Sequence, residues 1–163
     1  MKVLLVRHAI AVDRDTPGIS DHLRPLTEEG VSRFRKSARA VAAMVTADAV
    51  LTSPLLRAKQ TAEILTRHWP GITIQEVEAL GSGSREEFEA ALARLPKNST
   101  VAAVGHEPHA SEWTAEWLGA SNSSAFPFKK GGVALIEFDG AAEEGEGRLV
   151  FFLAPKALKA LSD

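Results

Sequence analysis

Two arginines and two histidines stand in the sequence where they could together bind a phosphoryl group. Arg7 and His8 directly follow one short apolar run, Arg57 comes soon after another, and His106 comes soon after a third. Arginine binds phosphate oxygens through parallel N–H donors, and a neutral histidine nitrogen can act as a nucleophile. These residue types therefore indicate a pocket for a dianion, with a histidine available to attack it.

Strands and helices must alternate along the chain to bring these four residues together. Continuous apolar runs at 3–6, 49–51, 72–74 and 101–104 are typical of strands buried on both faces, although the third run is weak. Apolar residues at helical spacing follow the runs: Val31, Phe34, Ala38, Val41 and Val45; Leu55, Ala58, Ala62 and Leu65; Phe88, Ala91, Leu92 and Leu95; Ala110, Trp113 and Trp117. This alternation predicts a three-layer α/β/α sandwich with a mostly parallel central sheet.

The C-terminal part of the chain departs from this alternation. Residues 133–138 and 149–153 are strand-like, and the polar stretch between them suits a hairpin. We therefore expect the last two strands to form an antiparallel edge on the parallel sheet. No repeat or linker divides the sequence, so residues 1–163 are predicted to form a single domain.

One long segment, residues 9–28, lacks obvious periodicity and separates the first strand from the first helix. We expect Thr27 to cap that helix, with Glu28 and Glu29 near its positive end. The segment leaves the carboxyl end of the first strand, where open α/β sheets bind ligands. The chain has no other insertion large enough to form a lid, so an open, shallow site is expected, which only the 9–28 segment could cover.

The composition excludes several other classes of protein. The 163 residues carry 19 basic and 21 acidic side chains, for a net charge of −2, so no nucleic-acid partner is expected. Cysteine is absent, which excludes disulfides, thiolate–zinc sites and cysteine nucleophiles. No apolar run approaches the length of a membrane span and no signal peptide is evident, so a cytoplasmic protein without a membrane partner is expected. His22, His68 and His109 lack metal-ligand spacing, so neither a metal nor a cofactor is expected.

Three motifs make the sequence similar to a known family. VRHA at 6–9, SPLLRAKQTAE at 53–63 and VGHEP at 104–108 resemble the histidine phosphatase superfamily, which has the phosphoglycerate mutase-like fold. Within that superfamily the chain looks most like the SixA branch of phosphohistidine phosphatases, as RPLTEEG at 24–30 and FKKGGVALIEF at 128–138 also indicate. The resemblance extends from the first strand to the last.

The resemblance implies a role for each of the four residues. His8 would be the nucleophile that becomes a phosphohistidine, while Arg7, Arg57 and His106 would bind the phosphoryl group. Relatives often have glycine after the histidine, where this chain has Ala9. Potentially cationic neighbours should lower the pKa of His8 below about 6.5 and keep its ring neutral. The same cations would compensate the charge that develops on the transferring group.

The resemblance also implies a general acid, whose identity the sequence leaves open. Relatives often carry a glutamate after the third strand, and Glu78 is the best match, with Glu76 and Glu107 as alternatives. A phosphate ester needs such an acid more than phosphohistidine does, because imidazole leaves more readily than alkoxide.

The expected function is a metal-independent phosphatase that removes phosphate from phosphohistidine in a signalling or phosphotransfer protein. One alternative is a broad-specificity phosphomonoesterase acting on small phosphate esters, and another is a non-catalytic phosphoprotein-binding module. Mutase activity is less favoured. Lys129 and Lys130 are interpreted as a solvated turn, with a rim that attracts acidic partners as the alternative.

Overall fold

The computed structural model describes residues 1–162, and its centre is one six-stranded sheet. The strands are β1 (Lys2–Arg7), β2 (Ala49–Thr52), β3 (Ile74–Glu76), β4 (Thr100–Gly105), β5 (Val133–Phe138) and β6 (Gly147–Leu153). Their order across the sheet is β3-β2-β4-β1-β5-β6. The first four neighbours pair in parallel, whereas β5 pairs antiparallel with both β1 and β6. The predicted mostly parallel sheet with an antiparallel C-terminal edge is confirmed.

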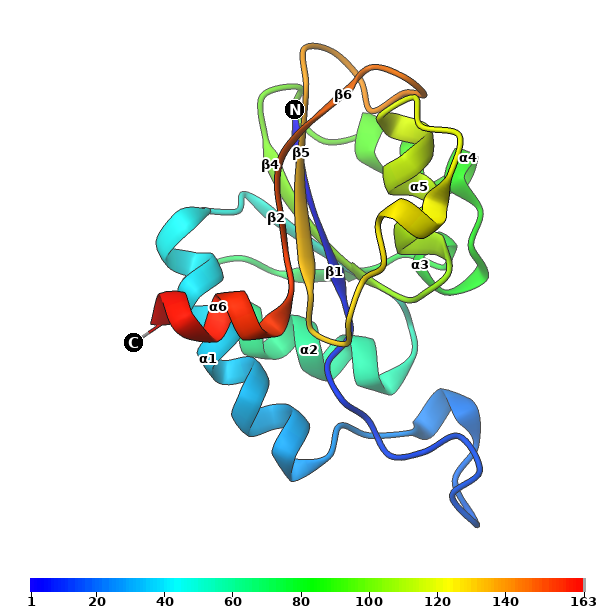
Figure 1. Ribbon diagram of the computed structural model, residues 1–163, viewed down its shortest axis with the longest axis vertical. Helices are drawn as coiled ribbons and strands as arrows, with labels where there is room; N and C mark the ends of the chain where they lie inside the picture. The colour runs from blue at the N-terminus through cyan, green and yellow to red at the C-terminus, as the bar shows by residue number, and fades with distance from the viewer. Residues whose placement is uncertain (163) are drawn as a thin grey trace.

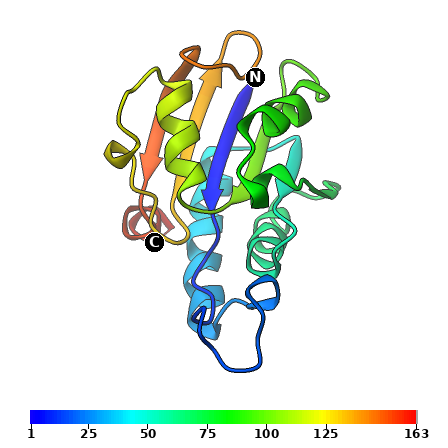
Figure 2. The same ribbon diagram turned by 90° about the vertical axis from the view of Figure 1, so that its right-hand side faces the viewer.

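Helices cover both faces of this sheet (Figures 1 and 2). One layer contains α1 (Glu28–Met44), α2 (Leu56–Thr66) and α6 (Pro155–Ser162). The other layer contains α3 (Ala79–Ser82), α4 (Arg85–Ala93) and α5 (His109–Trp117). Short 3-10 turns form at η1 (Asp21–Leu23) and η2 (Ser123–Ala125). None of the helices in residues 1–162 combines the length and apolar character that crossing a bilayer requires.

The sheet separates two hydrophobic cores, which explains why its central strands are apolar throughout. In β1, Leu4 and Val6 pack towards the α1 and α2 layer, while Val3 and Leu5 pack towards the α4 and α5 layer. All four side chains are at most 2% exposed. A strand buried on both faces cannot alternate apolar with polar residues, so it reads as a continuous apolar run.

The expected elements differ from the observed ones in two places. The third strand was expected at 72–74 but spans Ile74–Glu76, where Gln75 and Glu76 are exposed at the sheet edge, so it carries little apolar signal. The sequence analysis also missed α3 and α6. The four residues of α3 are too few to show a helical period, and α6 buries only Leu158.

The 9–28 segment is an excursion whose two arms pair at its base. Val12 N–H donates to the carbonyl of Pro25 at 2.9 Å, and Thr27 N–H donates to that of Ile10 at 3.0 Å. Thr27 caps α1 as expected, because its hydroxyl accepts the Gly30 N–H at 2.9 Å. The η1 turn lies on the returning arm of the excursion, and the excursion projects beyond the end of β1 (Figure 2). The segment is therefore ordered by backbone pairing although its sequence has no period.

Gly30 should tolerate no larger residue, because a Cβ there would overlap the carbonyl oxygen of Ile10. We expect Gly30→Ala to lower the free energy of unfolding by about 1–3 kcal/mol, since the base of the 9–28 excursion must shift. Urea unfolding measures this change. Gly140→Ala is the matched control, because nothing lies within 4 Å of its added Cβ. Equal stability of the two variants would contradict the close approach at Gly30.

Candidate active site

Parallel pairing of β1, β4 and β2 brings three chemically active side chains together where these strands end, at the carboxyl end of the sheet. Arg7 is in register with Gly105, and Thr52 is in register with Val104. His8, His106 and Ser53 follow these strand ends directly. His8 N–H donates to the Gly105 carbonyl and Ser53 N–H donates to the Val104 carbonyl, both at 3.0 Å. The His8 and His106 rings consequently lie 5.1 Å apart, centroid to centroid.

A hydrogen bond to the backbone sets the tautomer of His8. Its Nδ1 lies 2.7 Å from the carbonyl oxygen of Ala9. Because a carbonyl can only accept, Nδ1 carries the proton, and Nε2 of the neutral ring keeps its lone pair. The ring is only 6% exposed. The geometry thus leaves Nε2 as the His8 ring nitrogen whose lone pair is available to a bound group.

Burial keeps the His8 ring neutral. The pKa of His8 falls to about 3, mainly because the charged ring would lose its hydration. The hydrogen bond to Ala9 opposes this shift, while the charges of His106, Arg57 and Arg7 add to it by smaller amounts. The expected direction holds, and the cationic neighbours contribute to it as expected, but desolvation is the larger cause.

His106 is a neutral donor and not the cation that the sequence analysis allowed for. Burial, followed by the charge of Arg57, lowers the pKa of His106 to about 4. Its Nε2 lies 2.8 Å from the Ser53 hydroxyl oxygen, which already accepts the Leu55 N–H at 3.2 Å. Within residues 1–162 the buried Ser53 hydroxyl has no other acceptor, so its proton goes to Nε2, which leaves the ring proton of His106 on Nδ1.

Backbone carbonyls position the guanidinium groups of both candidate arginines. Arg7 Nη1 donates to the carbonyl of Phe128 at 2.6 Å. Arg57 Nη1 donates to the carbonyl of Asp21 at 2.8 Å, and its Nη2 lies 3.4 Å from the Asp21 carboxylate. These two Asp21 contacts tie the returning arm of the 9–28 excursion to α2. The 9–28 segment, which the sequence predicts as the part of the chain that could cover the site, therefore contacts the site through Asp21.

The unsatisfied polar atoms of the protein gather at this site. Within residues 1–162, the buried side-chain nitrogens and oxygens without a hydrogen-bond partner are Arg7 Nε, Arg57 Nε and His106 Nδ1. Such groups are rare in folded proteins, because each costs about 1–3 kcal/mol. All three can donate a hydrogen bond. An anion with several oxygens, such as a phosphoryl group, matches their number and polarity.

Three residues of the site are largely buried, although the sequence predicted a shallow site. His8, Arg57 and His106 are 6%, 4% and 8% exposed, respectively. These exposures describe the side chains themselves, and the open access of a substrate to the site stays a prediction. Asp21, by contrast, keeps 39% of its side chain exposed.

Sequence reasoning missed two residues that position this site, Asp21 and Thr61. Asp21 bonds Arg24 as well as Arg57, and although burial alone would raise the Asp21 pKa, Arg57 and Arg24 lower it. The Thr61 hydroxyl accepts the Ala9 N–H at 3.0 Å and donates to the Arg57 carbonyl at 2.7 Å. Thr61 could have been found from its i,i+4 spacing to Arg57, which places both on one helix face. Asp21 has no comparable signal beyond its place in a long loop.

The three glutamates considered as the general acid have different surroundings. Glu78 is exposed at the start of α3, and no hydrogen bond or ion pair within residues 1–162 joins its side chain to the four core residues. Glu76 pairs with Lys59 at 2.6 Å. Glu107 accepts hydrogen bonds from the Ser111 hydroxyl, the Ser111 N–H and the Phe128 N–H. The structure thus brings Arg7, His8, Arg57 and His106 together and leaves Glu78 outside that cluster.

Comparison with known proteins places this geometry in a family. The sequence model of the histidine phosphatase superfamily (branch 1) matches residues 3–90. The chain belongs to this superfamily. An uncharacterized protein of Picosynechococcus sp. (strain PCC 7002) is 32% identical over 97% of this chain and 99% of its own length. The resemblance noted in the sequence is confirmed.

Two solved structures extend the similarity to the SixA branch. The protein histidine phosphatase SixA complexed with tungstate is 28% identical, covers 98% of this chain and 100% of its own, and has a TM-score of 0.81. A candidate phosphohistidine phosphatase SixA from Agrobacterium tumefaciens is also 28% identical, with coverages of 94% and 97% and a TM-score of 0.77. The protein is therefore a phosphatase with a SixA-like fold, and its substrates are phosphorylated.

The low pKa of His8 makes the protein lose stability in acid. Above pH 6.5 the ring is neutral in the folded and unfolded states, whereas between pH 6.5 and about 3 only the unfolded chain takes up the proton. We expect wild type to lose about 2 kcal/mol more unfolding free energy than His8→Asn between pH 7 and pH 5. Urea unfolding at both pH values measures the difference. Equal losses would show that His8 titrates normally in the folded protein.

Glu107 should act as a structural anchor, so its amide variant should be less stable. In Glu107→Gln, an NH₂ group replaces an oxygen that accepts from Ser111 or Phe128, so two donors face each other. We expect the free energy of unfolding to fall by about 1–3 kcal/mol. Glu78→Gln is the matched control and should change stability by less than about 0.5 kcal/mol, since Glu78 is exposed and unbonded. Unchanged stability of Glu107→Gln would contradict the anchoring role.

Proposed function

We propose that this phosphatase removes phosphoryl groups from phosphohistidine side chains of proteins, with His8 as the nucleophile. The observation that carries the proposal is the buried, neutral His8 ring, whose Nδ1–H is bound to Ala9 while Nε2 remains free. The unpartnered donors of Arg7, Arg57 and His106 surround the same place. The 28% identity to SixA structures over nearly the whole chain supports the choice of substrate.

The first step transfers the phosphoryl group to His8. Nε2 of His8 attacks phosphorus, so an N–P bond forms while the bond to the leaving nitrogen breaks and its electron pair returns to that nitrogen. Arg7 and Arg57 bind the equatorial oxygens and compensate their charge, and Nδ1–H of His106 donates to one of them. The Ala9 carbonyl stabilises the ring as it gains positive character.

The second step regenerates the enzyme. Water attacks the phosphorus of phospho-His8, the new O–P bond forms, and the P–Nε2 bond breaks with its electron pair returning to Nε2. Inorganic phosphate leaves, and the proton lost by water goes to solvent. The same arginines stabilise this transition state, because the charge again develops on the equatorial oxygens. The ring returns to the neutral tautomer that Ala9 holds.

The surroundings of the carboxylates favour phosphohistidine over a phosphate ester. Within residues 1–162, the carboxylate that bonds one of the four core residues is that of Asp21, which contacts Arg57. The lowered pKa of Asp21 makes it a poor proton donor. Glu107 is occupied by hydrogen bonds, and no hydrogen bond or ion pair within residues 1–162 joins Glu78 to the four core residues. An alkoxide leaving group needs a positioned acid, whereas imidazole needs much less help. The site therefore suits a nitrogen leaving group better than an oxygen one.

The test compares wild type and His8→Ala, with chelator present, on a phosphohistidine-containing phosphotransfer protein and on p-nitrophenyl phosphate. We expect metal-independent phosphate release that His8→Ala reduces by at least about a thousand-fold, because the nucleophile is lost. His68→Ala, which removes an exposed histidine far from the core residues, should retain full activity.

The two substrates separate the proposal from its alternatives. A higher kcat/KM on the phosphohistidine protein supports the proposal, whereas a higher value on the ester would indicate a small-molecule phosphomonoesterase. Binding of the phosphoprotein without turnover of either substrate would indicate a binding module.

A further inference from the structure

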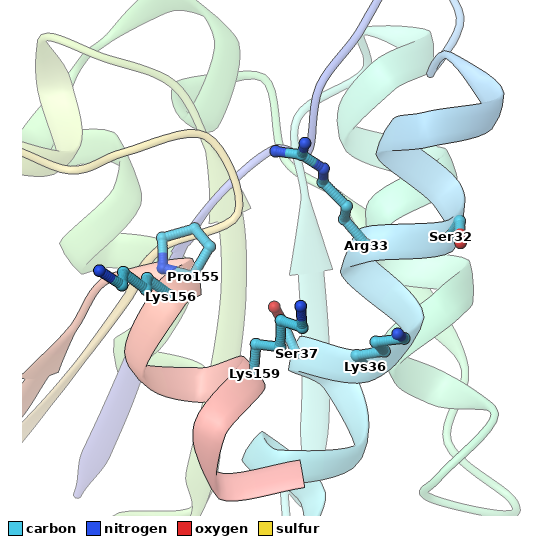
Figure 3. Close-up of a pocket in the computed structure, with 7 residues that line it drawn as sticks. All are labelled: Ser32, Arg33, Lys36, Ser37, Pro155, Lys156 and Lys159. Carbon is cyan, nitrogen blue, oxygen red and sulfur yellow. The ribbon is translucent and has the colours of Figure 1, made fainter. Parts of the chain in front are cut away.

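A continuous groove runs between the first and last helices on the α1 face of the molecule. It consists of two adjoining hollows of about 430 Å³ each, which share Arg33, Ser37 and Pro155. Figure 3 shows the first hollow, where side chains of α1 and α6 line opposite sides. Six exposed cations line the two hollows, and we call this surface the basic groove: Arg33, Lys36, Lys129, Lys130, Lys156 and Lys159.

The positive charge of the basic groove is segregated from a chain that is acidic as a whole. The protein has 21 acidic and 19 basic residues, yet no aspartate or glutamate lines either hollow. Arg33 pairs with Glu29 at 2.5 Å, whereas the five lysines form no ion pair within residues 1–162. The five lysines repel one another when left unmatched. Ion pairing within residues 1–162 therefore does not explain why they gather here.

One end of the basic groove adjoins the candidate nucleophile. Arg7 and Ala9, the two neighbours of His8 in the chain, line the second hollow. Gly131, which follows the lysine pair of the groove, donates its N–H to the carbonyl oxygens of both Arg7 and His8 at 3.0 Å. A partner lying in the groove would therefore extend directly away from a group held at His8.

The shape and lining of the groove favour a protein segment. Its second hollow has apolar residues beside the cations, namely Ile10, Phe34 and Pro155. A peptide with acidic and apolar side chains matches both kinds of surface, whereas a membrane or a nucleic acid needs a broad basic face. Here the cations line two adjoining hollows of about 430 Å³ each, with apolar side chains beside them.

We infer that the basic groove docks an acidic segment of the phosphoprotein substrate, close to its phosphohistidine. This inference rests on the proposed function and adds the class of partner. Opposite charges in the groove speed the encounter and align the substrate, so they act on kcat/KM and weaken with salt. A small substrate that reaches only the His8 pocket does not use the groove.

The test uses two synthetic phosphohistidine peptides of equal length, one flanked by glutamates and one by glutamines. Wild type should show at least about a five-fold higher kcat/KM on the glutamate peptide at low ionic strength, and the preference should shrink at about 0.5 M salt. Lys36→Glu/Lys156→Glu, which reverses one charge on each side of the groove, should abolish the preference. Its kcat/KM on p-nitrophenyl phosphate should stay within about two-fold of wild type, since neither lysine is among the residues that contact the core four.

The matched control is Arg67→Glu/Lys97→Glu, which makes the same change in net charge. Both residues are exposed and follow the ends of α2 and α4, at the opposite edge of the sheet from His8. The control should keep the full preference for the glutamate peptide. Circular dichroism and thermal unfolding of both double variants show whether each one is folded, and anisotropy of the labelled peptides measures binding directly.

The outcomes separate this inference from the proposed function. Turnover of both peptides without a preference, or a preference that survives in Lys36→Glu/Lys156→Glu, would overturn the docking role and leave the proposed function intact. Lack of turnover, combined with binding of the glutamate peptide that only the groove variant loses, would overturn the proposed function and support docking. Groove-dependent binding to phosphatidylserine vesicles or single-stranded DNA, without any peptide preference, would assign the groove to another class of partner.

Discussion

The parallel hydrogen-bonded register of β1, β4 and β2 is the constraint on which the candidate site depends. Because Arg7 faces Gly105 and Val104 faces Thr52, the residues that follow each strand leave the sheet at the same level. A slip of one residue in any of these pairings would turn the side chains to the other face. The two cores on either side of the sheet oppose such a slip, since every β1 residue from Val3 to Val6 is buried. Packing far from the site thereby determines its geometry.

The same burial that stabilises the sheet also determines the chemistry of the histidines. Both rings lie at the end of apolar strands, and loss of hydration is the largest cause of their low pKa values. A ring in water would be partly protonated near neutral pH and unable to attack phosphorus. Here the His8 ring stays neutral without a neighbouring base, and as a consequence the folded protein loses stability in acid. The arginines are then available to bind oxygens, because they are not needed to keep His8 deprotonated.

Sequence patterns predicted the parts of the fold that repeat and the residues that carry chemistry at strand ends. The central strands, the long helices and the cluster of Arg7, His8, Arg57 and His106 follow from apolar periodicity combined with the geometry of parallel sheets. The exposed edge strand β3 and the single-turn helix α3 could not be found in that way, because neither buries a periodic face. Asp21 reaches Arg57 across 36 positions through an aperiodic loop, and tertiary contacts alone determine that meeting. The position of the Glu78 side chain likewise depends on how α3 packs, which local sequence does not specify.

Thr61 links the strand end at His8 to Arg57, which lies 49 positions further along the chain than His8. Its hydroxyl joins the N–H of Ala9 to the carbonyl of Arg57, so the end of β1 and the first turn of α2 are held by one oxygen atom. The spacing between His8 and Arg57 is therefore fixed during folding, before any substrate arrives. An incoming phosphoryl group meets a rigid template and loses little of its binding energy to ordering the protein. Because this hydrogen-bonded link belongs to the folded protein, the geometry of the site is the same for every substrate that can reach it.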